Sequence, residues 1–159
     1  MDIVRLNMQD ELVAGSVWRL QHKAYAIEAQ LIGFAQLPPL METIASLQQC
    51  EQDFYGVVAD EELQAVISIE EYDQTVTVCR LMVEPEHHRK GLGRQLLRYV
   101  EQLYPVAKLF LVSTGSLNEP ALRLYQSMGY KPRRQWEAAP GLMLTDLAKR
   151  AERDRSATD

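Results

Sequence analysis

The chain has 159 residues, a formal net charge of −5 and a sequence pI of about 5.3. Hydrophobic residues make up 47% of the sequence and charged residues 25%, which is ordinary for a globular protein that buries its core without disulfide or metal staples. The acidic balance excludes a general electrostatic attraction to nucleic acid or anionic membranes, and no apolar run approaches the roughly 18 residues of a membrane span.

The first half of the chain opens with a strand and continues with two helical patterns. Branched residues predict a strand over residues 3–6, and residues 1–7 lack the features of a signal peptide. Apolar spacing of three and four predicts a helix over residues 8–29, with a stripe made by Leu12, Val13, Val17 and Leu20. A loop is expected over residues 31–40, where Gly33 and two prolines interrupt any regular element, and then a helix over residues 41–49 with Ile44 and Leu47 facing inward.

Three strands are predicted in the middle of the chain, over residues 54–59, 63–70 and 75–83. In the third, the apolar alternation slips by one residue between Val78 and Leu81. Either a fully buried strand or a β-bulge near Cys79 explains this slip, and the sequence leaves both open.

The second half of the chain alternates helices and strands. A helix over residues 91–103 is stopped by Pro105, and a short apolar strand follows over residues 106–112. Asn118 as N-cap and Gly129 as the residue after the C-terminus delimit another helix, and residues 130–136 and 142–147 predict a final strand pair. Without repeats or a linker, this pattern predicts one α/β or α+β domain over residues 1–150, with a flexible tail over residues 151–159.

A dense cationic cluster surrounds two glycines where the third middle strand gives way to a helix. The first amides of a helix lack internal partners and carry the positive end of its dipole, so they suit a phosphate. Gly91 and Gly93 lack a Cβ, which lets a ligand approach the backbone. In an acidic protein the cluster predicts a local anion pocket, although glycines that only shape a turn beside solvated cations are the alternative.

Two well-known phosphate-binding loops do not fit this turn. A P-loop requires Gly-Lys-Ser/Thr, whereas Gly93 is followed by Arg94 and Gln95. A dinucleotide fingerprint requires a small residue where Leu96 stands. The turn therefore serves another ligand.

Two motifs resemble those of the GNAT superfamily of acetyl-CoA-dependent N-acetyltransferases. The segment His88-x-x-Gly91-x-Gly93 is similar to its motif A, Gln/Arg-x-x-Gly-x-Gly/Ala, and departs from it only at the first position. Residues 118–130 are similar to its Asn-x-x-Ala-x-x-x-Tyr…Gly-Phe/Tyr signature at every position. The first fifty residues also resemble an uncharacterised bacterial branch. The resemblance implies a single-domain α/β (α+β) GNAT fold with a mixed, mostly antiparallel sheet of six to seven strands flanked by about four helices.

The resemblance implies an enzyme that transfers an acetyl group from acetyl-CoA to a primary amine of a small molecule or protein, by direct attack in a ternary complex. Two alternatives stay open: a catalytically silent CoA-binding module and an unrelated nucleotide-phosphate binder. No metal, nucleic acid or membrane partner is expected, because the histidines lack ligand spacing and the chain lacks a basic field. Two widely separated cysteines fit a reduced, cytoplasmic protein. The resemblance implies a monomer or a homodimer.

The resemblance also assigns roles to individual residues. Tyr125 is the expected general acid. Asn118 is expected either to contact the cofactor or only to cap the helix that it begins. Glu28 and Glu70 are the preferred candidates for the general base, with an ordered water as the alternative. The backbone of Leu81, Met82 and Val83 is expected to pair with the pantetheine arm. The alternative is an ordinary core strand, and both can hold together. The pyrophosphate is expected to bind, mostly through amides, the turn made by His88, Arg89, Lys90, Gly91, Leu92, Gly93 and Arg94.

Overall fold

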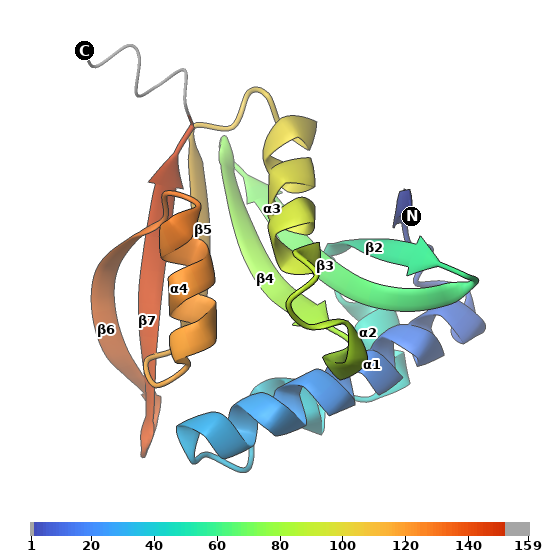
Figure 1. The fold of residues 1–159 in the computed structure, drawn as a ribbon, viewed down its shortest axis with the longest axis horizontal. Helices are drawn as coiled ribbons and strands as arrows, with labels where there is room; N and C mark the ends of the chain where they lie inside the picture. The colour runs from blue at the N-terminus through green and yellow to red at the C-terminus, as the bar shows by residue number, and fades with distance from the viewer. Residues whose placement is uncertain (1, 152–159) are drawn as a thin grey trace.

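Seven strands of the described chain form one open sheet in the order β1-β2-β3-β4-β5-β7-β6 (Figure 1). The computed structural model describes residues 2–151. All neighbouring strands are antiparallel except β4 and β5, which run parallel. This confirms the mixed, mostly antiparallel sheet. The strands are β1 (Asp2–Arg5), β2 (Asp53–Ala59), β3 (Glu62–Tyr72), β4 (Thr75–Val83), β5 (Leu109–Gly115), β6 (Lys131–Ala139) and β7 (Leu142–Arg150).

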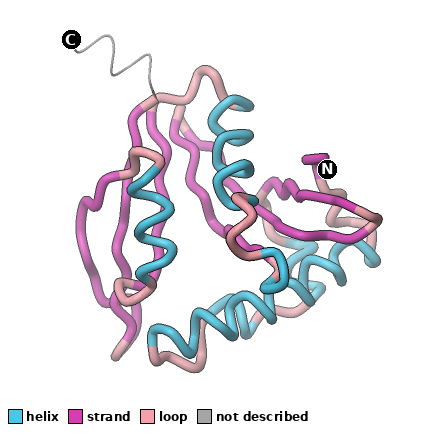
Figure 2. The backbone as a smooth tube through the Cα atoms, in the orientation of Figure 1, coloured by secondary structure: helices cyan, strands magenta, loops and turns pink. Residues whose placement is uncertain are grey.

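Four α-helices within residues 2–151 cover the two faces of the sheet, as Figure 2 traces. On one face Val66 and Met82 pack against Leu47 and the first half of α1. On the other, the core beneath α3 and α4 includes Ile67. No helix among these residues is both long and apolar enough to cross a membrane. The helices are α1 (Glu11–Ile32), α2 (Ile44–Gln49), α3 (Leu92–Leu103) and α4 (Glu119–Ser127), with the short 3₁₀ turns η1 (Pro38–Met41) and η2 (Pro85–His87).

A β-bulge in β4 explains the slip in its apolar pattern. Ser68 of β3 faces Arg80, but the next residue, Ile69, faces Val78, so Cys79 has no partner on β3. The extra residue exchanges the two faces of the strand: Val78 lies in the core beneath α3, and Met82 lies in the core beneath α1. The bulge is therefore the correct one of the two explanations.

The N-terminal helices begin later than their apolar patterns predict. α1 begins at Glu11, because the Asp10 carboxylate accepts the Leu12 N–H at 2.9 Å, and Leu12 is 83% exposed rather than on the buried stripe. α2 begins at Ile44 because its N-cap, Thr43, forms a capping box. Ile44 is 37% exposed, so its expected inward orientation is wrong.

The strand expected over residues 106–112 is displaced by three residues, to Leu109–Gly115. The Ala107 N–H donates to the Tyr104 carbonyl at 3.1 Å, which closes a turn after α3, and Val106 is 54% exposed. Ala151 is held by a hydrogen bond from its N–H to the Lys108 carbonyl at 3.0 Å. The rest of the expected tail, residues 152–159, lies outside the described residues.

Candidate active site

β4 and β5 separate in the middle of the sheet. They pair only from Thr75–Val78 to Leu109–Val112, although β4 continues to Val83 and β5 to Gly115. Figure 1 shows the strands diverging toward the end crossed by α1, where α3 and α4 both begin. Backbone groups on strand edges require hydrogen-bond partners, so the split can accept an extended ligand as an added strand. It also lies at the carboxyl ends of parallel strands, where α/β sheets bind ligands.

A small recess of about 80 Å³ lies in this split and draws side chains from four elements. α1 closes it on one face by crossing from β4 to the β6–β7 hairpin, where Ala29 packs with Leu142. Gly115 permits this crossing, since a Cβ there would lie 3.0 Å from Ile32 Cγ2. The recess is lined by Tyr25, Glu28, Val78, Cys79, Arg80, Leu81, Val112, Ser113, Thr114, Asn118, Ala121 and Tyr125.

Tyr125 enters the recess from α4 and is 5% exposed. No hydrogen bond within residues 2–151 involves its hydroxyl group. Burial, with the nearby charge of Glu28, raises the pKa of the Tyr125 phenol above its usual range. Like any phenol it is protonated at neutral pH, so it can donate that proton to a ligand.

Of the two carboxylates predicted as a base, the structure brings only Glu28 to Tyr125. Glu28 Oε1 accepts hydrogen bonds from Asn118 Nδ2 at 3.1 Å and from Thr114 Oγ1 at 3.4 Å. These two donors hold the carboxylate between α1 and α4. Glu70 lies exposed on β3 and does not line the recess.

Asn118 uses both ends of its side-chain amide. Its Oδ1 accepts the Ala121 N–H at 3.3 Å, which confirms the predicted N-cap of α4, and its Nδ2 donates to Glu28. A contact between this side chain and a cofactor would compete with one of these bonds. The connection that it makes from α4 to α1 could not be expected from the sequence, where the two residues are 90 positions apart.

The turn before α3 presents a row of backbone amides. Gly91 is the N-cap with a φ of 76°, and Arg89 also has a positive φ of 68°. The first helical hydrogen bond runs from the Gln95 N–H to the Gly91 carbonyl at 3.0 Å. None of the N–H groups of residues 89–94 has an acceptor within residues 2–151. Together with the helix dipole, this arrangement suits an anion.

The two glycines of this turn differ in what surrounds their Cα atoms. A Cβ on Gly91 would meet no atom within 4 Å, so this position is open to a ligand. A Cβ on Gly93 would lie 3.2 Å from Leu124 Cδ2, so Gly93 also allows α3 to approach α4, and its role in ligand approach stays a prediction. His88 Nε2 lies 3.2 Å from the Val83 carbonyl and thereby connects the turn to the end of β4.

Gly93→Val is expected to lower the free energy of unfolding by about 1–3 kcal/mol, because the added side chain overpacks the contact between α3 and α4. Thermal or denaturant unfolding measures this loss. Gly15→Ala is the control, since its Cβ would have ordinary contacts, the nearest at 3.5 Å. An unchanged midpoint in Gly93→Val would show that the two helices can separate freely.

A buried ion pair that the sequence did not suggest lies beside the recess. Arg80 is 8% exposed, and its Nη2 donates to both carboxylate oxygens of Glu42 at 2.8 and 2.9 Å. Its Nη1 donates to Ser68 Oγ at 3.3 Å and to Gln52 Oε1. Burial opposes the charge of Arg80, but the hydrogen bond and charge of Glu42 outweigh it and raise the pKa of the guanidinium.

Glu42 belongs to the connection between η1 and α2, so this ion pair fixes that connection to β4. The buried Gln21 of α1 also donates to Glu42 Oε1 at 3.0 Å and to the Pro39 carbonyl at 2.8 Å. The network therefore holds α1, the connection after η1 and the sheet together behind the recess. Within the described residues, no group of three or more His, Cys, Asp or Glu is placed to hold a metal ion.

The chain resembles known acetyltransferases in sequence. A family model described as an acetyltransferase (GNAT) domain matches residues 50–132. The chain is 34% identical over 140 residues to the UPF0157 protein YqkA of Bacillus subtilis. The aligned region covers 88% of this chain and 41% of that relative. It spans less than half the length of the curated relatives that it matches.

Solved structures share the fold. The ribosomal-protein-S18-alanine N-acetyltransferase of Escherichia coli has a TM-score of 0.74 and 16% identity, over 94% of this chain and 93% of that one. An aminoglycoside 6′-N-acetyltransferase complexed with coenzyme A has a TM-score of 0.73 and 15% identity, over 95% and 97%. Because the family model covers just over half of the sequence and the split sheet has the predicted architecture, the chain belongs to the acetyltransferase (GNAT) domain family.

Proposed function

We propose that the chain binds acetyl-CoA and transfers its acetyl group to a primary amine. The observation that carries this proposal is the split between β4 and β5, whose recess places a protonated phenol beside a held carboxylate. Family membership supports acetyl transfer in general terms. The residue roles and the ternary mechanism belong to the proposal.

The residues around the split fit coenzyme A in two places. The amides of residues 89–94 supply donors for the pyrophosphate, and Gly91 leaves room for it. The pantetheine arm carries amide groups, which can pair with the open edge of β4 at Leu81, Met82 and Val83. The side chain of Met82 is buried in the core beneath α1, so this strand has a packing role as well.

The proposed reaction forms a C–N bond and breaks the C–S bond of the thioester. Glu28, directly or through a water, takes the proton of the amine, and Tyr125 gives a proton to the thiolate that leaves. A covalent acetyl-enzyme on the thiol at the bulge is disfavoured, because burial, with the charge of Glu70, raises the pKa of Cys79 to about 11. Direct attack by the amine needs no such intermediate.

The acceptor is proposed only as a primary amine, on a small molecule or a protein. The two solved relatives described above are named for one acceptor of each kind. A cytoplasmic location and a monomeric or homodimeric state remain predictions.

Acetyl-CoA is expected to raise the Tm. At 100 times its Kd, a ligand that binds only the folded state stabilises it by about 2.7 kcal/mol, or about 5–11 °C for a chain of this size. Thermal-shift titration with acetyl-CoA and with NAD measures this effect, and an equal response to NAD would contradict the cofactor assignment. Release of free thiol with a panel of amines then separates an enzyme from a catalytically silent CoA-binding module.

Glu28→Gln is expected to lower kcat/KM about 10²-fold, because it removes a proton acceptor while keeping the side-chain size and an oxygen for Asn118. Glu70→Gln is the matched control and is expected to stay within about twofold, since an exposed carboxylate outside the recess takes no part. Steady-state rates with one amine substrate compare the two variants. The reverse order of effects would transfer the role of base to Glu70.

A further inference from the structure

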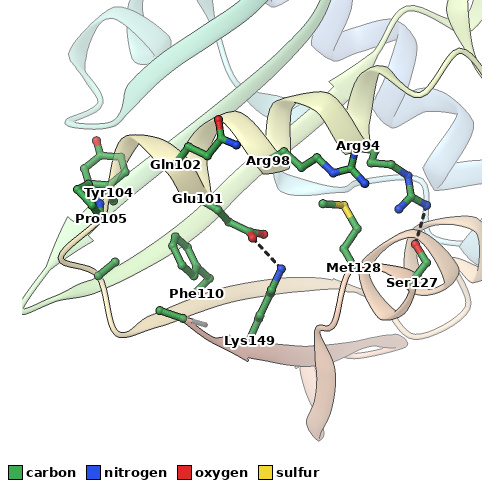
Figure 3. A pocket seen from close by; sticks show the side chains of 12 residues that line it. Arg94, Arg98, Glu101, Gln102, Tyr104, Pro105, Phe110, Ser127, Met128 and Lys149 are labelled. Carbon is green, nitrogen blue, oxygen red and sulfur yellow. Dashed lines mark hydrogen bonds and ion pairs between the residues drawn. The ribbon is translucent and has the colours of Figure 1, made fainter. Parts of the chain in front are cut away.

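A groove of about 570 Å³ follows α3 from Arg94, the last residue of the glycine turn, to the turn after the helix, with Ser127 at the end of α4 on its other side. Figure 3 shows it from close by, with Phe110 of β5 beneath and side chains of α3 along one wall. Arg94 belongs both to the turn and to this groove. A ligand whose phosphates bind the turn can therefore extend into the groove.

The cations of this groove differ in whether a carboxylate neutralises them. Lys149 Nζ lies 2.7 Å from Glu101 Oε1, and the Tyr130 hydroxyl donates to the same carboxylate at 3.1 Å. Arg94 Nη2 donates to the neutral Ser127 Oγ at 2.8 Å. Arg98 is exposed, and no hydrogen bond or ion pair within residues 2–151 involves it. Two guanidinium groups thus remain without an acidic partner in a chain whose net charge is −5.

The spacing of these two arginines matches one feature of coenzyme A. Arg98 follows Arg94 by four residues, so its Cα lies ~6 Å further along α3 and on the same side of the helix. In coenzyme A, a single ribose separates the pyrophosphate from the 3′-phosphate. With the pyrophosphate at the amides of residues 89–94, the 3′-phosphate reaches the next turn of α3.

We propose that Arg98, assisted by Arg94, binds the 3′-phosphate of coenzyme A, so that this groove distinguishes coenzyme A from its 3′-dephospho form. A guanidinium donates two parallel hydrogen bonds to a phosphate, which favours arginine at such a position. The inference rests on the proposed function and adds to it a residue that recognises the 3′-phosphate of the cofactor.

Isothermal titration with coenzyme A and 3′-dephospho-coenzyme A tests this assignment without any acceptor substrate. The unaltered chain is expected to bind coenzyme A about tenfold more tightly than the dephospho form. Arg98→Gln is expected to weaken coenzyme A severalfold and leave the dephospho form unchanged. The control Arg133→Gln removes an exposed cation of β6 that does not line the groove, and is expected to keep the tenfold preference.

Equal affinities for the two ligands in the unaltered chain, or an unchanged preference in Arg98→Gln, would overturn the assignment of the groove while leaving the proposed function intact. Failure of both ligands to bind would instead overturn the proposed function, and this inference with it.

Discussion

Replacement of Tyr125 by phenylalanine is expected to lower kcat about 10²-fold while leaving the Kd of acetyl-CoA within about twofold. A phenol is protonated at neutral pH, and burial and Glu28 raise the pKa of Tyr125 further. No hydrogen bond to another described residue holds the hydroxyl, so its loss removes a proton donor and little packing. Pre-steady-state rates with saturating amine, together with titration of acetyl-CoA, separate the two effects.

Tyr99→Phe is the matched control for this variant. Tyr99 lies on α3, its ring packs against Tyr55, and it does not line the recess. Its variant is expected to keep both kcat and the affinity for acetyl-CoA. If Tyr125→Phe retained full turnover, a water or the acceptor itself would have to protonate the thiolate, and the role given to Tyr125 would be wrong.

Replacement of Arg80 by methionine is expected to lower the free energy of unfolding by about 3 kcal/mol or more, because it leaves Glu42 without its partner in a partly buried position. For a chain of this size, that loss corresponds to a fall in Tm of about 6–12 °C. Arg80 is 8% exposed and Glu42 is 23% exposed at their side chains. Calorimetric unfolding measures the effect.

Two further variants distinguish a buried ion pair from a general effect of losing an arginine. Arg5→Met removes an exposed partner of Asp53, whose pair is 70% and 41% exposed, and is expected to cost at most about 1 kcal/mol. The double variant Arg80→Met with Glu42→Leu removes both charges and is expected to recover much of the lost stability. Equal losses in Arg80→Met and Arg5→Met would contradict the assigned importance of the buried network.

The parts of the fold that follow local rules could be predicted from the sequence. Asn118 and Gly129 delimit α4 because capping and positive φ depend on one or two residues. The ends of β5 were misplaced because Val106 is apolar yet lies in an exposed turn, and an apolar residue carries no signal of its exposure. The slip in the apolar alternation of β4 was visible in the sequence. Only the pairing of β4 with β3 in the structure distinguished a bulge from a fully buried strand.

The residues of the candidate site that belong to motifs could be proposed from the sequence, whereas the long-range contacts around them could not. Tyr125 and the glycine turn stand in recognisable patterns. The Arg80–Glu42 pair joins residues 38 positions apart, and neither residue belongs to a motif. The choice of Glu28 over Glu70 as the carboxylate beside Tyr125 likewise follows from the packing of α1 across the split, which no local pattern encodes.

A crystal structure with bound coenzyme A tests the central proposal most directly. We expect the pyrophosphate at the amides of residues 89–94, the pantetheine arm beside Leu81–Val83 in the split between β4 and β5, and the sulfur within hydrogen-bond distance of the Tyr125 hydroxyl. Coenzyme A bound outside the split, or with its sulfur directed away from the recess of Tyr125 and Glu28, would contradict the proposed active site.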